Sequence, residues 1–174
     1  MPQLSKQKEI SLILSSFAQS SIGIFSAFSS VPVKATGARK IDEQISETDI
    51  YGTILFVGIP AGKVEICLNK DMARQLAANI ALCEPEELSD EDVYDGVGEI
   101  INQIAGNTRT LLWDEGFKTE ISTPAVTDES NLSEYDKKRN QSIYIIDFDC
   151  SAGFVALQIC LRFTEKKPIE ALQS

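Results

Sequence analysis

The sequence predicts an α+β fold in which about three helices cover one face of a mainly antiparallel sheet. Two observations support this fold class. Three segments have the apolar spacing of amphipathic helices, namely 5–29, 71–83 and 89–114. Between and after them lie short stretches rich in β-branched and aromatic residues, which is typical of strands. The 174 residues are expected to form a single domain, 1–174, because a chain of this length can bury a sizeable core.

The first half of the chain should form a helix, a hairpin and a second helix. The helix 5–29 has a broad apolar face with three phenylalanines that belong either to the core or to a contact between two copies, Phe17, Phe25 and Phe28. Pro32 and Gly37 then interrupt helical continuity. Residues 48–57 and 64–68 are predicted strands joined by the turn GIPAGK, and the second helix follows.

The third helix has clear start and stop signals. Ser89 is a good N-cap, and the acidic first turn that follows it suits the helix dipole. The helix should run to about Asp114 and stop at Gly116. This helix follows the acidic stretch EPEEL and has strong sequence signals at both ends.

The rest of the chain should be strands. Residues 117–126 are predicted as one strand with Pro124 near its end, followed by a polar loop at 127–140. Two long strands come next, 142–150 and 154–163, and the first is expected to be an edge strand that needs cover, such as pairing across a dimer. The tail 164–174 is weakly patterned.

Composition excludes several function classes. The formal net charge of −10 argues against a nucleic-acid-binding function, because a protein needs a basic face to bind phosphates. The chain has no histidine, so Ser-His-Asp triads, Cys-His dyads and histidine-ligated metals are excluded. Its four cysteines form no CxxC pair and are expected to be reduced, buried thiols without a metal.

The sequence favours a cytoplasmic protein with no membrane insertion. No apolar run reaches the length of about 18 residues that a membrane span needs, because serines interrupt residues 10–28. The N-terminal stretch MPQLSKQKEI lacks the compact apolar region and cleavage site of a signal peptide.

A polar strip follows one side of the third helix. At about 100° per residue, four residues fall within about 60° of one another, Asp95, Glu99, Asn102 and Gly106. Trp113 lies near the far end of this strip, and the apolar face is on the other side. An ordinary solvated face would also explain the polar residues.

Three glycines stand in this helix although each costs it about 1 kcal/mol relative to alanine. Gly106 lies on the exposed strip, where its missing side chain would let another protein approach. Gly96 and Gly98 lie on the flanks, where close packing against a neighbouring element explains them equally well.

The stretch DGVGEIINQIAGNTRTLL, followed by ISTPAV, resembles the signature of the CheC/CheX/FliY phosphatases of bacterial chemotaxis. Asp95, Glu99 and Asn102 match that signature, and Pro124 follows after 21 intervening residues, one fewer than is usual. The order of the elements is also similar to that of a CheX-like chain over nearly its full length. Only Glu99 has an asparagine three residues later, which favours the CheX type with one site and, typically, a homodimer.

The resemblance implies hydrolysis of the aspartyl phosphate of a CheY-like response regulator. Asn102 would then position the attacking water, and Glu99 would engage the regulator's lysine. Asp95 would be a supporting contact or a solvated carboxylate, and Gly106 would allow close approach. Gly98 and Pro124 would be structural parts of the motif. No cofactor of its own is expected, because the regulator carries the Mg²⁺.

Two other functions compete with this interpretation. The chain could be a non-catalytic dimeric binding module or adaptor in a chemotaxis or other two-component signalling assembly, as FliY-type relatives suggest. A glycosidase that uses Asp95 and Glu99 is disfavoured, because the sequence gives no sign of an aromatic-lined sugar cleft.

Overall fold

The computed structural model describes residues 5–29, 32–41, 48–130, 142–151 and 153–162. The predicted tail 164–174 and most of the predicted loop 127–140 lie outside these residues. The described helices are α1 (Lys6–Phe28), α2 (Lys70–Ala81), the short 3-10 turn η1 (Pro85–Glu87) and α3 (Asp90–Asp114). The described strands are β1 (Val33–Ile41), β2 (Ile50–Ile59), β3 (Ala61–Leu68), β4 (Lys118–Ile121), β5 (Ala125–Thr127), β6 (Ser142–Cys150) and β7 (Val155–Arg162).

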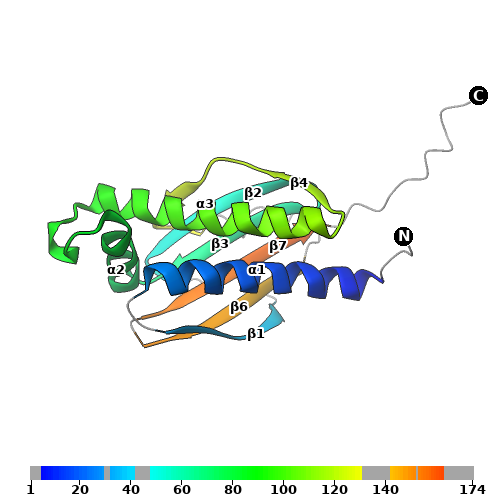
Figure 1. Ribbon diagram of the computed structural model, residues 1–174, viewed down its shortest axis with the longest axis horizontal. Helices are drawn as coiled ribbons and strands as arrows, with labels where there is room; N and C mark the ends of the chain where they lie inside the picture. The colour runs from blue at the N-terminus through cyan, green and yellow to red at the C-terminus, as the bar shows by residue number, and fades with distance from the viewer. Residues whose placement is uncertain (1–4, 30–31, 42–47, 131–141, 152, 163–174) are drawn as a thin grey trace, which may run out of the picture.

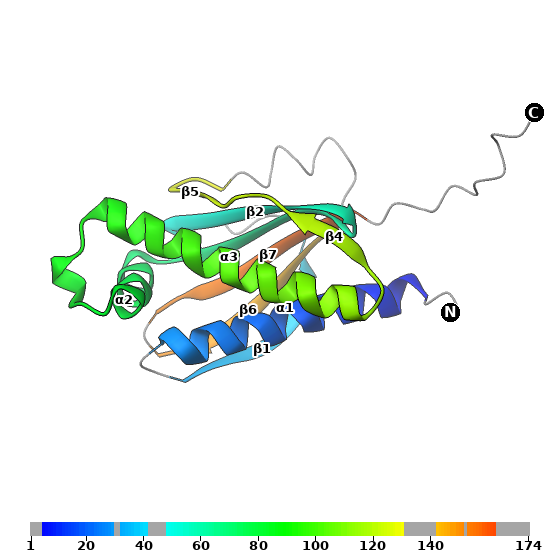
Figure 2. The same cartoon turned by 45° about the horizontal axis from the view of Figure 1, so that its top comes forward.

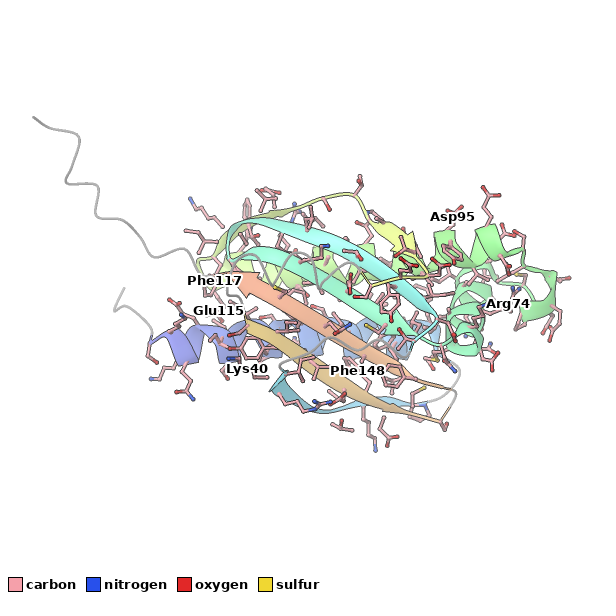
Figure 3. All side chains as sticks on the ribbon, turned by 180° about the vertical axis from the view of Figure 1, so that it is seen from behind. Lys40, Arg74, Asp95, Glu115, Phe117 and Phe148 are labelled. Atoms are coloured by element: carbon pink, nitrogen blue, oxygen red, sulfur yellow. The ribbon has the colours of Figure 1, made fainter. Side chains whose placement is uncertain are left out.

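The strands form one antiparallel sheet in the order β1-β6-β7-β3-β2-β4, and β5 also pairs with β2. Helices α1 and α3 lie across one face of this sheet, with α2 at one end (Figure 1). The opposite face carries none of the three helices, and it faces the viewer in Figure 3. The predicted α+β class, with helices on one face of an antiparallel sheet, is confirmed.

Strand β1 is absent from the sequence prediction. It pairs with β6 from Val33 opposite Cys150 to Ile41 opposite Ile143, with a bulge between Ala35 and Gly37. Most of its side chains are exposed, so it lacks the apolar alternation that reveals a half-buried strand. Because β1 covers β6, the prediction that residues 142–150 form an edge strand is wrong.

The predicted strand 117–126 is two short strands, β4 and β5. Between them, the Ser122 backbone N–H donates to the Leu55 carbonyl at 2.9 Å, and the Leu55 N–H donates to Ser122 Oγ at 3.1 Å. Pro124 has no backbone N–H for the ladder. The chain therefore leaves β2 at Ser122 and rejoins it at Ala125, which leaves Pro124 free to face α3.

The core lies between the helices and the sheet. Phe17 of α1 meets Phe56 of β2 edge-to-face at 5.3 Å between ring centroids, and Phe25 meets Phe148 of β6 in the same way at 5.3 Å. Phe28 packs against this core while partly exposed. Of the two roles left open for these three phenylalanines, core packing is the one the structure supports.

Helix α1 is long and apolar enough to cross a membrane, with a mean hydropathy of 1.4 over its best window. Its residues Ile13, Phe17 and Phe25 are at most 1% exposed because they pack inside the protein. Ser16 and Ser21 donate their hydroxyls to carbonyls one turn earlier, Leu12 at 3.0 Å and Phe17 at 2.8 Å. One side of α1 therefore packs into the core against the sheet.

All four cysteines are free. Cys67 and Cys160 are buried as predicted, whereas Cys83 and Cys150 are partly exposed. Burial raises the pKa of the Cys67 thiol far above its ordinary value, although the side-chain amide of Gln158 contacts its sulfur at 3.2 Å. Cys67 is therefore a neutral structural thiol rather than a nucleophile.

Candidate functional site

Helix α3 carries the predicted site, and its first turn is strongly determined. Ser89 Oγ accepts from the Asp92 N–H at 3.2 Å, and Asp92 Oδ2 accepts from the Ser89 N–H at 2.8 Å. These bonds to Ser89 lower the pKa of Asp92 below its ordinary value. This reciprocal capping box explains why α3 begins as predicted.

Arg74 of α2 holds the segment that leads into α3. Its guanidinium donates to the Leu88 carbonyl at 2.6 Å, to the Pro85 carbonyl at 3.2 Å and to Asp90 at 2.6 Å. Figure 3 shows Arg74 and Asp95 at the same end of the molecule. The contact orients the N-terminal turns of α3, where the polar strip begins.

The inner face of α3 is buried against the sheet and the other helices through Val93, Val97, Ile100, Ile101, Ile104, Ala105, Thr108 and Leu112. Gly96 lies where α3 crosses α2, and a Cβ built there would stand only 2.5 Å from the Ala77 Cβ. Packing against a neighbouring element therefore explains Gly96. The rest of the buried face points the polar strip away from the core.

Asp95, Glu99 and Asn102 are exposed on that strip. Gln103 Nε2 donates to Glu99 Oε1 at 2.7 Å, so one oxygen of this carboxylate is held in place. No described residue forms a hydrogen bond with the Asn102 side chain. At Gly106 a Cβ would meet nothing within 4 Å, so the fold of the described residues does not require glycine there.

A groove opens beside the strip. Its volume is about 410 Å³, and it lies between α3 and the connection from β4 to β5, lined by Tyr94, Asp95, Gly98, Glu99, Asn102, Pro124 and Val126. Figure 2 shows that connection running alongside α3. The amide and both carboxylates of the predicted motif therefore share one solvent-open groove.

Gly98 and Pro124 form the floor and the far wall of this groove. A Cβ at Gly98 would lie 3.6 Å from Val126 and 3.8 Å from the Pro124 ring, which is ordinary contact distance. The missing side chain therefore leaves a narrow space between the helix and the wall. This places both residues of the predicted structural motif next to the polar groups.

The structure brings together five of the six predicted site residues, and Gly106 lies one turn beyond the groove on the same strip. Sequence analysis did not single out three neighbours, Tyr94, Gln103 and Val126. Two of them had usable signals. Gln103 follows Glu99 by one helical turn, and Val126 follows Pro124 at the spacing that shares one strand face.

The groove offers hydrogen-bonding and charge chemistry. Glu99 provides a carboxylate, and Asn102 provides an amide that both donates and accepts. Within the described part of the chain, no group of three or more metal-ligating side chains is gathered. Such a groove is suited to orienting a water or a cationic side chain of a partner.

Sequence comparison identifies the family. The family model described as Chemotaxis phosphatase CheX matches residues 50–149, which run from β2 to β6 and include α3 and the groove. No curated protein sequence matches the chain.

Solved structures agree with this family. CheX from Vibrio vulnificus is 26% identical with a TM-score of 0.71, covering 86% of this chain and 99% of that one. A CheC-like protein from Shewanella is 22% identical with a TM-score of 0.73, covering 87% and 97%.

A CheX-CheY-BeF3-Mg²⁺ complex from Borrelia burgdorferi has 18% identity and a TM-score of 0.63, covering 86% and 97%. At such low identity the resemblance supports the fold alone, and the family match covers more than half of the chain. The chain therefore belongs to the CheX family of chemotaxis phosphatases.

Proposed function

We propose that this protein is a phosphatase that hydrolyses the aspartyl phosphate of a CheY-like response regulator. The observation that carries the proposal is the exposed pair Glu99 and Asn102, which line one groove on a helix whose inner face is buried. The family match and the CheX-CheY complex of a relative support the choice of partner.

The reaction requires little covalent chemistry from the catalyst. A water oxygen attacks phosphorus in line, the bond from phosphorus to the aspartyl oxygen breaks, and inorganic phosphate and a free carboxylate result. The regulator's Mg²⁺ neutralises charge on the phosphoryl group. The phosphatase contributes by positioning the water, which suits a chain without histidine.

Asn102 is the proposed water-positioning residue. Its side-chain oxygen accepts from the attacking water, and its NH₂ group donates to an acceptor on the regulator. Because no described residue forms a hydrogen bond with this amide, docking breaks none of the protein's own bonds there. The groove beside it leaves room for side chains of the partner.

Glu99 is proposed to pair with the lysine of the regulator and so to set the register of docking. Its Oε1 is held by Gln103, which leaves Oε2 to face the lysine. Asp95, one turn earlier on the strip, is a supporting contact. Gly106 allows close approach, and Gly98 with Pro124 keeps the groove open.

We further propose that residues 1–174 act as one cytoplasmic domain that forms a homodimer. A row of exposed apolar side chains supports a contact between copies, because Leu55, Val57 and Ile59 project from β2 on the face away from the helices. The outer strand β1 is a poorer surface for sheet extension, since it carries a bulge and the positive side chains of Lys34, Arg39 and Lys40.

The decisive experiment is the decay of a phosphorylated CheY-like regulator in Mg²⁺, with and without about a tenth of an equivalent of this protein. We expect faster decay with the wild type and a loss of at least ~100-fold in the added rate for Asn102→Ala. Asn107→Ala is the matched control, since Asn107 is exposed on α3 but off the strip.

Each result has a clear meaning. Decay that accelerates only in proportion to bound protein, without turnover, would favour the non-catalytic dimeric adaptor instead. Equal activity of Asn102→Ala and wild type would remove Asn102 from the reaction.

A further inference from the structure

Trp113 is half exposed although its orientation is fixed. It is the only tryptophan of the chain, it is 51% exposed, and its Nε1 donates to the Thr119 carbonyl of β4 at 2.9 Å. The polar edge of the indole is therefore satisfied by the protein. The ring exposes an apolar surface to water. Because the side chain is already oriented, it would lose less conformational entropy on binding a partner than a free side chain would.

Arg109 and Glu120 complete the arrangement around this ring. The Arg109 Cζ lies 5.9 Å from the Trp113 ring centroid, and its Nη1 is 2.9 Å from Glu120 Oε2. The solvent-exposed ion pair places a carboxylate next to the guanidinium that lies over the ring. We call Arg109, Trp113 and Glu120 the Trp113 platform.

The platform continues the strip that carries the proposed site. In helical projection Arg109 and Trp113 lie within about 20° of Asn102, roughly 10 and 16 Å along the axis. Gly106 lies between them, with nothing within 4 Å of a Cβ placed there. A partner surface resting on Asn102 can therefore extend over Gly106 to the indole without meeting a side chain at that turn.

The position of Trp113 indicates which partner would contact it. Among the described residues, the other exposed large apolar side chains are Leu55, Val57, Ile59, Leu82 and Phe154. None of these lies on α3, whereas Trp113 shares the strip with Asn102. An ordinary interface covers about 800 Å² on each partner, which is broad enough to include both residues.

We propose that the Trp113 platform is a second contact for the CheY-like response regulator that docks at Glu99 and Asn102. The platform sets the affinity for that regulator. This inference rests on the proposed function, because it extends the surface for the same partner. Tryptophan and arginine are the side chains that most often dominate binding energy at interfaces. Because the platform is far from the reacting phosphoryl group, it acts on binding rather than on the chemical step.

Kinetics separate these two effects. We expect Trp113→Ala to raise the KM for the phosphorylated regulator ~10–100-fold while kcat stays within about 2-fold of wild type. Trp113→Phe keeps an aromatic face but loses the bond to Thr119, and should raise KM by less than about 5-fold. Leu82→Ala is the matched control, since Leu82 is 92% exposed and belongs to neither surface.

A direct probe avoids relying on a variant that folds poorly. Incorporation of 5-fluorotryptophan places one ¹⁹F reporter at position 113, because the chain has no other tryptophan. Its resonance should shift when a regulator activated with beryllium fluoride and Mg²⁺ is added, and stay in place with the unactivated regulator at the same concentration.

The outcomes distinguish this inference from the function on which it rests. If the wild type accelerates decay but the resonance does not move and Trp113→Ala keeps its KM, the inference is wrong and the function stands. If the wild type does not accelerate decay, the proposed function itself fails. If Trp113→Ala dissociates a homodimer, the platform belongs to a second copy, which also overturns the inference.

Discussion

The side-chain amide of Gln103 donates a 2.7 Å hydrogen bond to Oε1 of Glu99, one turn earlier on α3. Both side chains reach the surface beside the groove, and the bond limits the directions in which the carboxylate can point. A docking carboxylate that is already oriented loses less conformational entropy when a lysine arrives.

This bond predicts a positioning role for Gln103. Gln103→Ala should lower kcat/KM for the phosphorylated regulator by ~3–10-fold, which is the effect of losing one modest hydrogen bond. Gln103→Glu should lower it further, because a second carboxylate would repel Glu99. Gln75→Ala removes a similar bond, to Asn79 on α2, and should leave kcat/KM unchanged. Steady-state kinetics with all three variants test this, and equal values for Gln103→Ala and wild type would contradict it.

Substitution by alanine should change the stability of the protein in opposite directions at Gly106 and at Gly96. Gly106→Ala should stabilise the protein by about 1 kcal/mol, because the new methyl group meets nothing and the helix gains propensity. Gly96→Ala should destabilise it, because overpacking against Ala77 costs about 1–3 kcal/mol. Urea denaturation measures both changes.

The exposed turn at Gly106 also predicts an effect of side-chain size on activity. Gly106→Leu should fold normally yet lower kcat/KM for the regulator ~10-fold or more, because the added side chain would keep the partner away from Asn102. Normal activity of Gly106→Leu would show that the partner does not approach this turn.

The capping box predicts a dependence of stability on pH. Ser89 lowers the pKa of Asp92 in the folded state, so the stabilisation is present above the ordinary value of 3.8 and is lost as pH falls through the lowered value. The difference in Tm between wild type and Asp92→Ala should therefore stay constant from about pH 5 to 7 and shrink as the pH falls below 3.8. Thermal scans over this range check it, and a constant difference down to the lowest pH would contradict it.

The apolar row on β2 predicts how the proposed dimer breaks. Val57 is 63% exposed, and Val57→Lys should convert a dimer into a monomer because a lysine there would be desolvated at the contact. Light scattering after gel filtration measures the mass. Lys40→Glu on the outer strand β1 is the control. A dimer that survives Val57→Lys but not Lys40→Glu would place the contact at the β1 edge of the sheet.

Local signals explain which elements could be predicted. Helix α3 was predictable at both ends because Ser89 with Asp92 and Gly116 act within a few residues of the chain. Strand β1 was not, because its partner β6 lies more than a hundred residues later and its exposed side chains carry no apolar period. Pro124 is a local signal of an interruption, but the place where the strand breaks depends on bonds from Ser122 to Leu55 of another strand, which a local pattern does not reveal.

The sequence by itself determined the strip of Asp95, Glu99, Asn102 and Gly106, because a helical period of about 3.6 residues places those side chains in line wherever the helix packs. Only the tertiary structure decided that the strip borders a groove. Its second wall, Val126 of β5 and Pro124 just before that strand, lies more than 20 residues later, and its position depends on the pairing of β5 with β2. Contacts between distant segments reflect the packing of the whole core, which periodicity along one element does not encode.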